Sequence, residues 1–135
     1  MLVCAALAAR ERGGHGTHLQ TSLLETAISS MTFQNQRYLS LGEVPEAAGN
    51  DHPIIAPYGL FATADQPINI AVGSEAVWRK LCAVLGAPGL ADEGIYANGA
   101  TRLHHRERLR EDLETLLAHG SAASWVSLLK EAGIP

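Results

Sequence analysis

The stretch of residues 49–86 constrains the fold most strongly, because a loop, two short apolar runs and a capped helix follow one another directly. The runs at residues 58–64 and 68–72 are rich in residue types that favour strands. An Asp-Gln-Pro sequence separates them, and its backbone chemistry favours a turn. The sequence therefore predicts a β-hairpin over residues 58–72, around which the rest of the chain packs.

A helix is predicted directly after the hairpin, over residues 74–85. Ser74 stands where an N-cap residue is expected, and Glu75 follows in the first turn. Gly86 is placed to close the helix. The apolar stripe that this helix is expected to bury recurs at helical spacing and consists of Val77, Leu81, Val84 and Leu85.

Length, charge and cysteine usage limit the class of protein. A complete domain of 135 residues, 47% of them hydrophobic, would bury about 65% of its unfolded surface, which is enough for one core. The net charge of −4 argues against nucleic acid or an anionic membrane as a partner, because either favours a basic surface. Cys4 and Cys82 lie in apolar helical contexts and are expected to be small buried residues in a reducing cytoplasm.

The N-terminal part of the chain is expected to be helical with one short strand. Nine apolar residues at the start are too few for a membrane span, which needs about 20, and their flanks do not match a signal peptide. They are interpreted as the last turns of a buried helix whose beginning is missing, so the chain is expected to be truncated. A strand is predicted over residues 17–22 and a continuous helix over residues 22–41, opened by a capping box of Ser22 and Glu25. The stripe predicted as core on that helix is Leu24, Ala27, Ile28, Met31, Asn35 and Tyr38.

Beyond the central stretch, two further helices are predicted, over residues 104–119 and 121–132, after an irregular segment at residues 87–99. Ser121 is expected to cap the second of them. The charged run on the first of them is interpreted as a solvated face, with two weak pairs four residues apart, Arg108 with Asp112 and Arg110 with Glu114. His104 and His105 are not expected to bind a metal, because adjacent helical side chains diverge and no third ligand stands at a suitable spacing.

The loop before the hairpin is the best candidate for a functional site. It is neither helix nor strand and is rich in residues with special backbone chemistry, and Pro53 and Pro57 are expected to stiffen it. The alternative is an ordinary connection whose prolines rigidify the entry to the hairpin. The candidate site residues are Gly49, Asn50, Asp51, His52, Ala56, Pro57 and Tyr58.

Taken together, these patterns predict an α+β fold with a short antiparallel hairpin and about five helices. A linker at residues 42–49 has neither helical nor strand periodicity.

The order of short motifs along the chain resembles the class III CoA-transferases, the superfamily that includes formyl-CoA transferase, carnitine CoA-transferase and α-methylacyl-CoA racemase. The motifs are a Gly-Asn loop, Ala-Pro-Tyr, Phe-x-Thr-Ala-Asp, Ile-Ala-Val-Gly, Trp-Arg-x-Leu-Cys and Leu-Ala-Asp. The resemblance implies that residues 1–41 are the end of a large-domain helix, a short strand and a linking helix, and that residues 42–135 are the small α+β domain. It also implies that the loop at residues 49–58 covers the active site, although the loop is not glycine-rich here. A second departure is Gln20, where family members often carry Asp.

In the family, an aspartate carboxylate attacks an acyl-CoA and the CoA then passes to an acceptor acid through an aspartyl-CoA thioester. The resemblance places that aspartate upstream of Met1, so no catalytic residue is expected in this chain, and no cofactor is expected to bind the chain alone. Coenzyme A and acyl-CoA would be substrates of the parent enzyme. The implied partners are the missing large-domain segments or a second subunit, with a homodimer in the full-length enzyme.

Two alternatives remain open at this stage. The first is a fragment of an α-methylacyl-CoA racemase, which needs an acid/base pair instead of a nucleophile. The second is a non-catalytic module that dimerises or complements a separately encoded partner. Exposed apolar faces on residues 2–9 and 24–38 would favour the second alternative.

Overall fold

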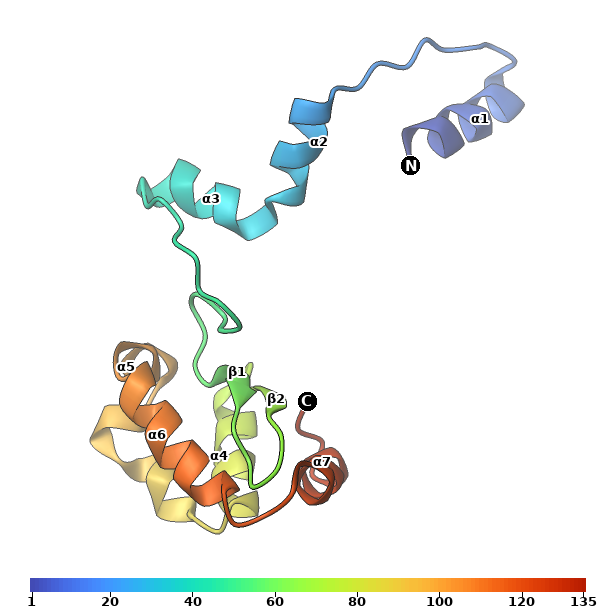
Figure 1. Cartoon of the computed structure of the whole chain (residues 1–135). Helices are drawn as coiled ribbons and strands as arrows, with labels where there is room; N and C mark the ends of the chain where they lie inside the picture. Colours follow the sequence, from blue (N-terminus) through green and yellow to red (C-terminus); the bar gives the residue numbers. More distant parts are fainter. The chain divides into compact units, whose positions relative to one another are not determined.

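The computed structural model describes residues 1–135, which form two compact units, Met1–Ala47 and Ala48–Pro135. Seven α-helices, two 3₁₀ helices and one two-stranded antiparallel sheet make up the chain (Figure 1). The predicted α+β class is confirmed, with more helices than the five expected. The division at residues 41 and 42 stays a prediction, because it concerns the domains of a larger parent protein.

The first unit contains three helices, α1 (Leu2–Gly13), α2 (Leu23–Ser30) and α3 (Thr32–Leu41). The predicted capping box is present, since the Ser22 hydroxyl accepts from the Glu25 amide and the Glu25 carboxylate accepts from the Ser22 amide. The prediction of one continuous helix over residues 22–41 is wrong. The chain breaks between α2 and α3, where Thr32 has a φ of 41°.

Three further predictions for the first unit are also wrong. Residues 17–22 do not form a strand, because no neighbouring strand pairs with them. The stripe at residues 24–38, which was predicted to be core, contains no buried residue. Helix α1 contains none either, so Cys4 is exposed and not buried as expected. The physical reason is the same in all three cases: a strand or an amphipathic face is completed only by another element that packs on it.

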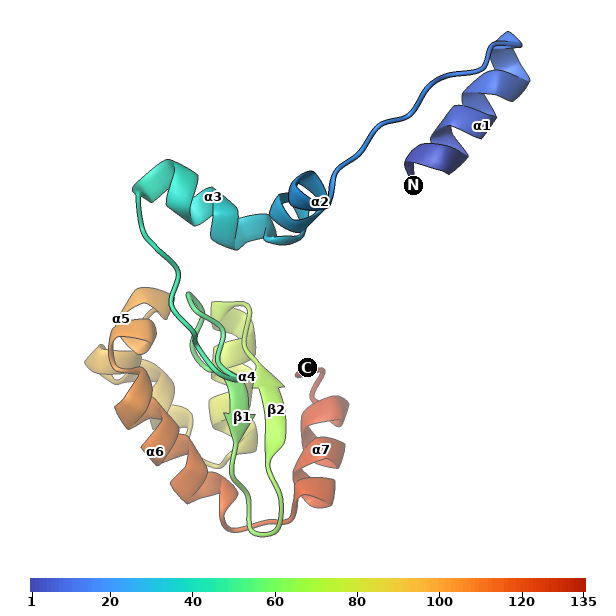
Figure 2. The ribbon, with the colours of Figure 1, turned by 45° about the horizontal axis from the view of Figure 1, so that its top comes forward.

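The second unit is built on the predicted hairpin, with β1 (Tyr58–Phe61) paired to β2 (Ile68–Ala71). Phe61 lies opposite Ile68 and both are buried, whereas Leu60 and Asn69 on the other face are exposed. In Figures 1 and 2 the hairpin lies between α6 and α7, and α4 lies behind it. The free edge of β2 is covered by the end of the chain, because the Ala71 amide donates to the Pro135 carbonyl at 2.9 Å.

Helix α4 (Glu75–Val84) begins at the predicted cap, where the Ser74 hydroxyl accepts from the Val77 amide at 3.3 Å. Leu81 and Leu85 of the predicted stripe are buried. The helix also buries Trp78 and Cys82, which widens the apolar face beyond that stripe.

The remaining elements are η1 (Pro88–Asp92), η2 (Gly94–Tyr96), α5 (Gly99–His104), α6 (Arg106–Leu117) and α7 (Ala122–Glu131). The helix predicted over residues 104–119 is present as α6, which is two residues shorter at each end, and α5 is a separate helix that was not predicted. The cap predicted at Ser121 is confirmed, because its hydroxyl accepts from the Ser124 amide. The side chains that form the centre of the core are Phe61, Ile68, Ile70, Val72, Trp78, Leu81, Cys82, Tyr96, Leu109, Leu113 and Leu117. None of the helices is long and apolar enough to cross a membrane.

The two cysteines are expected to differ in reactivity. Cys82 is fully buried, and burial raises the pKa of its thiol to about 11, whereas Cys4 is exposed. Because the thiolate is the reactive form, Ellman's reagent at about pH 8 should react rapidly with one thiol per folded chain and with two in urea. In the Cys4→Ser variant the rapid reaction should disappear. Two rapidly reacting thiols in the folded wild-type chain would contradict the buried position of Cys82.

Candidate functional site

The loop that precedes β1 has a defined backbone conformation. Gly49 has a φ of 59°, and the Asp51 amide donates to the Ala48 carbonyl at 3.0 Å, which closes a tight turn. The His52 amide donates to the Tyr58 carbonyl at 2.9 Å, and the two rings stack with their centroids 4.9 Å apart. The peptide bond between Ala56 and Pro57 is cis. The loop therefore turns back on itself and is fixed at both ends.

Three arginines spaced four residues apart, Arg102, Arg106 and Arg110, hold this loop against α5 and α6. Each donates to a main-chain carbonyl of residues 52–60. Because these acceptors belong to the backbone, the contacts fix the path of the loop whatever side chains the loop carries.

Arg110 holds the beginning of the loop and the strand that follows it. One of its guanidinium nitrogens pairs with the Asp51 carboxylate, and the other donates to the Leu60 carbonyl and to Glu114, the latter at 3.3 Å. The guanidinium also lies over the Phe61 ring, 4.8 Å from its centroid. One side chain thus joins the loop, the hairpin and α6.

Arg106 holds the middle of the loop. Its Nη2 atom donates to the His52 carbonyl at 2.9 Å and approaches the Pro53 carbonyl at 3.5 Å. Its side chain is half-buried. The polar contacts of this guanidinium are both with loop carbonyls, and no carboxylate lies within ion-pair distance of it.

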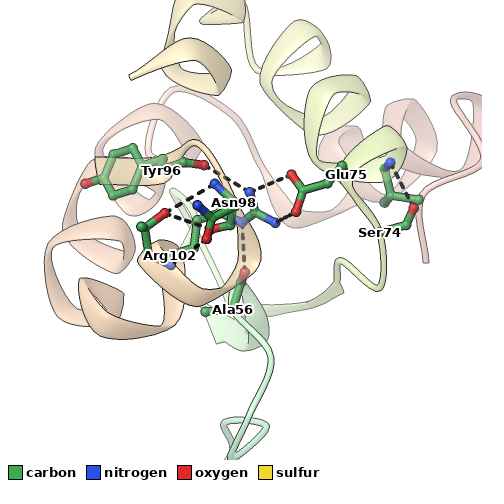
Figure 3. Close-up of polar contacts among 8 residues, drawn as sticks. Ala56, Ser74, Glu75, Tyr96, Asn98 and Arg102 are labelled. Atoms are coloured by element: carbon green, nitrogen blue, oxygen red, sulfur yellow. Dashed lines mark hydrogen bonds and ion pairs between the residues drawn. The ribbon is translucent and has the colours of Figure 1, made fainter. Parts of the chain in front are cut away.

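Arg102 holds the end of the loop from inside the core. It is 3% exposed, and Figure 3 shows its guanidinium between the Ala56 carbonyl, the Tyr96 carbonyl and the Glu75 carboxylate. The distances are 3.2 Å to Ala56, 2.9 Å to Tyr96, and 2.9 and 2.7 Å to the two oxygens of Glu75. The guanidinium also lies 5.0 Å from the Trp78 ring centroid. The hydrogen bonds from Arg102 lower the pKa of Glu75, which keeps that carboxylate charged.

Two hollows flank the loop. A pocket of about 150 Å³ lies between the loop and the beginnings of α4 and α5. A smaller one, of about 20 Å³, has room for roughly one water molecule on the other side of Ala56 and Pro57. The loop is thus surrounded by paired guanidinium and carboxylate groups and by apolar side chains.

The structure brings some of the predicted site residues together and leaves others apart. Asp51 pairs with Arg110, His52 stacks on Tyr58, and Ala56 and Pro57 are buried, whereas Gly49 and Asn50 form the exposed tip of the turn. The functional role of all seven candidate residues stays a prediction.

The sequence did not indicate that Arg102, Arg106 and Arg110 contact the loop, or that Glu75 pairs with Arg102. The interpretation of the charged run as a solvated face is wrong for Arg106 and Arg110, which turn toward the loop; of the two predicted pairs, Arg110 with Glu114 is present. Asp112, expected to pair with Arg108, instead accepts a hydrogen bond from the Tyr96 hydroxyl at 2.5 Å. The spacing of four between Arg106 and Arg110 was the available signal, because it places these two side chains on one face of α6. Arg102 lies on α5, so no spacing within one helix relates it to them.

His104 and His105 approach each other edge to face, with ring centroids 4.8 Å apart. No group of three or more His, Cys, Asp or Glu side chains in the chain is arranged to hold a metal ion.

The loop lies so close to Gly59 in β1 that a side chain at this position would clash with it. A Cβ atom at this position would lie 2.9 Å from the Asn50 carbonyl oxygen and 3.2 Å from the Asp51 Cα atom, in addition to a clash with the Asp51 carboxylate. Gly59→Ala should therefore displace the loop and lower the free energy of unfolding by about 1–3 kcal/mol, measured by urea denaturation. Gly73→Ala, where nothing lies within 4 Å, is the matched control and should change it by less than about 0.5 kcal/mol. Equal effects of the two substitutions would show that the loop does not lie against β1.

Comparison with known protein families shows the class to which this chain belongs. The model of CoA-transferase family III matches residues 1–135, and the chain belongs to that family.

Several relatives with assigned activities are similar to it. The acetyl-CoA:oxalate CoA-transferase of Acetobacter aceti is 32% identical over 133 residues, which cover 98% of this chain and 34% of that protein. The succinate–glutarate CoA-transferase of Agrobacterium fabrum is 37% identical over 111 residues, which cover 82% of this chain and 28% of that protein. The crystal structure of Rv3272 from Mycobacterium tuberculosis matches 99% of this chain and 34% of its own, with a TM-score of 0.84 and 29% identity. This chain therefore spans about a third of the length of the relatives it matches.

Proposed function

We propose that this chain is part of a class III CoA-transferase, an enzyme that moves CoA from an acyl-CoA to a carboxylic acid through an aspartyl-CoA thioester. The observation that carries the proposal is the family match over the whole chain, combined with coverage of 34% and 28% of two CoA-transferase relatives. In this proposal the chain supplies the loop-bearing small domain, and the nucleophilic aspartate belongs to a preceding part of the parent enzyme.

The proposed reaction splits one exchange into smaller covalent steps. The aspartate carboxylate attacks the thioester carbonyl of the acyl-CoA and expels the CoA thiolate, leaving a mixed anhydride. The thiolate then attacks the aspartyl carbonyl and releases the first acid as a carboxylate. The acceptor carboxylate attacks the resulting aspartyl-CoA thioester and expels the CoA thiolate, leaving a second mixed anhydride. The thiolate then attacks the acyl carbonyl of the acceptor, which forms the new acyl-CoA and frees the aspartate carboxylate.

The loop at residues 49–58 is proposed to cover these intermediates. A thioester or an anhydride is hydrolysed if water reaches it, so a cover that is fixed in place favours transfer over hydrolysis. The three arginine contacts to the backbone of residues 52–60 support this role, because they fix the path of the loop. The site residues of this proposal are the seven candidates from Gly49 to Tyr58.

The remaining segments of the parent enzyme are the proposed partner of this chain, with a homodimer in the cytoplasm as the complete assembly. The substrates to test first are small dicarboxylic acids, because oxalate, succinate and glutarate stand in the names of two similar relatives.

A second candidate is a non-catalytic module that complements another protein. The exposure of the first unit favours it: Leu23 is 92% exposed and Leu24 is 70% exposed. Such apolar surface is stabilised when a partner covers it.

The experiment compares this chain with the protein obtained when its coding region is extended in both directions. Each is incubated with acetyl-CoA or succinyl-CoA and with oxalate or glutarate, and the new CoA thioester is followed by chromatography. We expect transfer by the extended protein alone, with hydroxylamine trapping a hydroxamate on an aspartate outside residues 1–135. Transfer by the 135-residue chain would overturn the placement of the nucleophile, and an extended protein without transfer would favour the second candidate.

A further inference from the structure

Arg106 differs from the other two arginines of the series in what it contacts. Arg102 is bound to Glu75 and to the Tyr96 carbonyl, so its loss would disturb the core. Arg110 also contacts Glu114 and the Phe61 ring. The polar contacts recorded for Arg106 go to the loop carbonyls of His52 and Pro53.

The position of Arg106 makes these contacts important for the middle of the loop. Asp51 is fixed by Arg110, and Ala56 is fixed by Arg102. Between them, the Arg106 side chain donates to the main chain of residues 52 and 53. A guanidinium that donates to carbonyls binds more strongly than a neutral donor, and its half-buried position reduces competition from water.

We propose that Arg106 is a positioning residue for the CoA-transfer reaction: by holding the His52 and Pro53 carbonyls, it keeps the loop closed over the covalent intermediate. The proposal rests on the proposed function. Arg106 acts through the loop, and the consequence of losing it is that water reaches the aspartyl-CoA thioester. Hydrolysis then forms a carboxylate and free CoA thiol from the thioester and one water molecule, in competition with transfer to the acceptor acid.

The first test uses the 135-residue chain and needs no activity. Hydrogen exchange of the Asp51, His52 and Ile54 amides, which are bonded within or beside the loop, is measured by NMR in wild type and in Arg106→Met. We expect these amides to exchange about tenfold faster in the variant, with unchanged exchange in α4 and α6 and an unchanged melting temperature. Arg108→Met is the matched control, because Arg108 is exposed on the same helix, and it should leave the loop amides as in wild type. Arg106→Lys, which keeps a charged donor, should restore part of the protection.

The second test measures how the extended enzyme divides its thioester between transfer and hydrolysis. Arg106→Met should raise the ratio of free CoA to transferred CoA several-fold, and Arg108→Met should leave it unchanged. A purely structural defect lowers both products in proportion to the folded fraction, so it does not move this ratio.

The outcomes separate the two proposals. Unchanged exchange of the loop amides in Arg106→Met, or exchange that rises throughout the second unit together with a lower melting temperature, overturns the positioning role. A looser loop with an unchanged hydrolysis ratio also overturns it. If the extended wild-type protein transfers no CoA, the proposed function fails, and loop exchange in the 135-residue chain still decides whether Arg106 holds the loop.

Discussion

Replacing Arg102 with methionine is expected to lower the free energy of unfolding by about 3–5 kcal/mol. Methionine fills a similar volume but cannot donate, so the carbonyls of Ala56 and Tyr96 lose the hydrogen bonds that Arg102 gives them. Both residues are buried, at 6% and 0% exposure, so water cannot replace the lost donor without opening the core. Urea denaturation followed by circular dichroism measures the change.

The control is Arg79→Met, on the outer side of α4. Arg79 pairs with Asp92 at 3.2 Å, and the two side chains are 66% and 73% exposed. A pair so exposed contributes less than about 1 kcal/mol, so this variant should unfold close to wild type. If Arg102→Met also unfolds close to wild type, the buried guanidinium does not hold the loop to the core.

The pH dependence of the free energy of unfolding should reveal the ion pair between Arg102 and Glu75. Arg102 lowers the pKa of Glu75 in the folded chain below its ordinary value of 4.5. A carboxyl whose pKa is depressed by folding stabilises the chain above its unfolded pKa, and that contribution is lost as the pH falls through the folded value. Asp65 acts in the same direction, because the Ala122 amide and the Thr63 hydroxyl lower its pKa. Glu75→Gln should therefore flatten part of the acid side of the stability curve, and a curve identical to wild type would contradict the ion pair.

Leu113→Ala is expected to lower the free energy of unfolding by about 2–5 kcal/mol. Leu113 is fully buried on α6, the helix that packs against β1. Alanine favours the helix as well as leucine does, so the loss comes from apolar contacts and from the cavity left in the core.

Leu128→Ala on α7 is the matched control, because Leu128 is 47% exposed. Its substitution should change the free energy of unfolding by less than about 1 kcal/mol. Comparable losses at the two positions would mean that α6 is not packed as described.

The parts of the fold that depend on neighbours in sequence were predictable. The hairpin, the cap at Ser74 and the cap at Ser121 each follow from turn or capping chemistry within a few residues. The capping box at Ser22 was also predictable, because its two hydrogen bonds join residues three positions apart.

The parts that depend on distant partners were not predictable in the same way. Arg102 donates to Ala56, 46 residues earlier in the chain, and Arg106 donates to His52, 54 residues earlier. A charged residue on a helix is more often solvated, so local reasoning assigns these side chains to the surface. The helices α1 and α2 show the converse case, because their pattern predicts burial but no other element of the first unit covers them.

The contacts of Arg102 and Arg106 with the loop backbone affect which amino-acid sequences the loop can have. Arg102 and Arg106 recognise main-chain oxygens, which every amino acid possesses, so the helices act as a template that accepts many loop sequences with the same path. Side chains at positions such as Ile54, which is 47% exposed, are free to be exchanged without rebuilding the scaffold. In protein engineering, this separates two tasks: the helices set the path of the loop backbone, and the exposed loop side chains can be diversified independently.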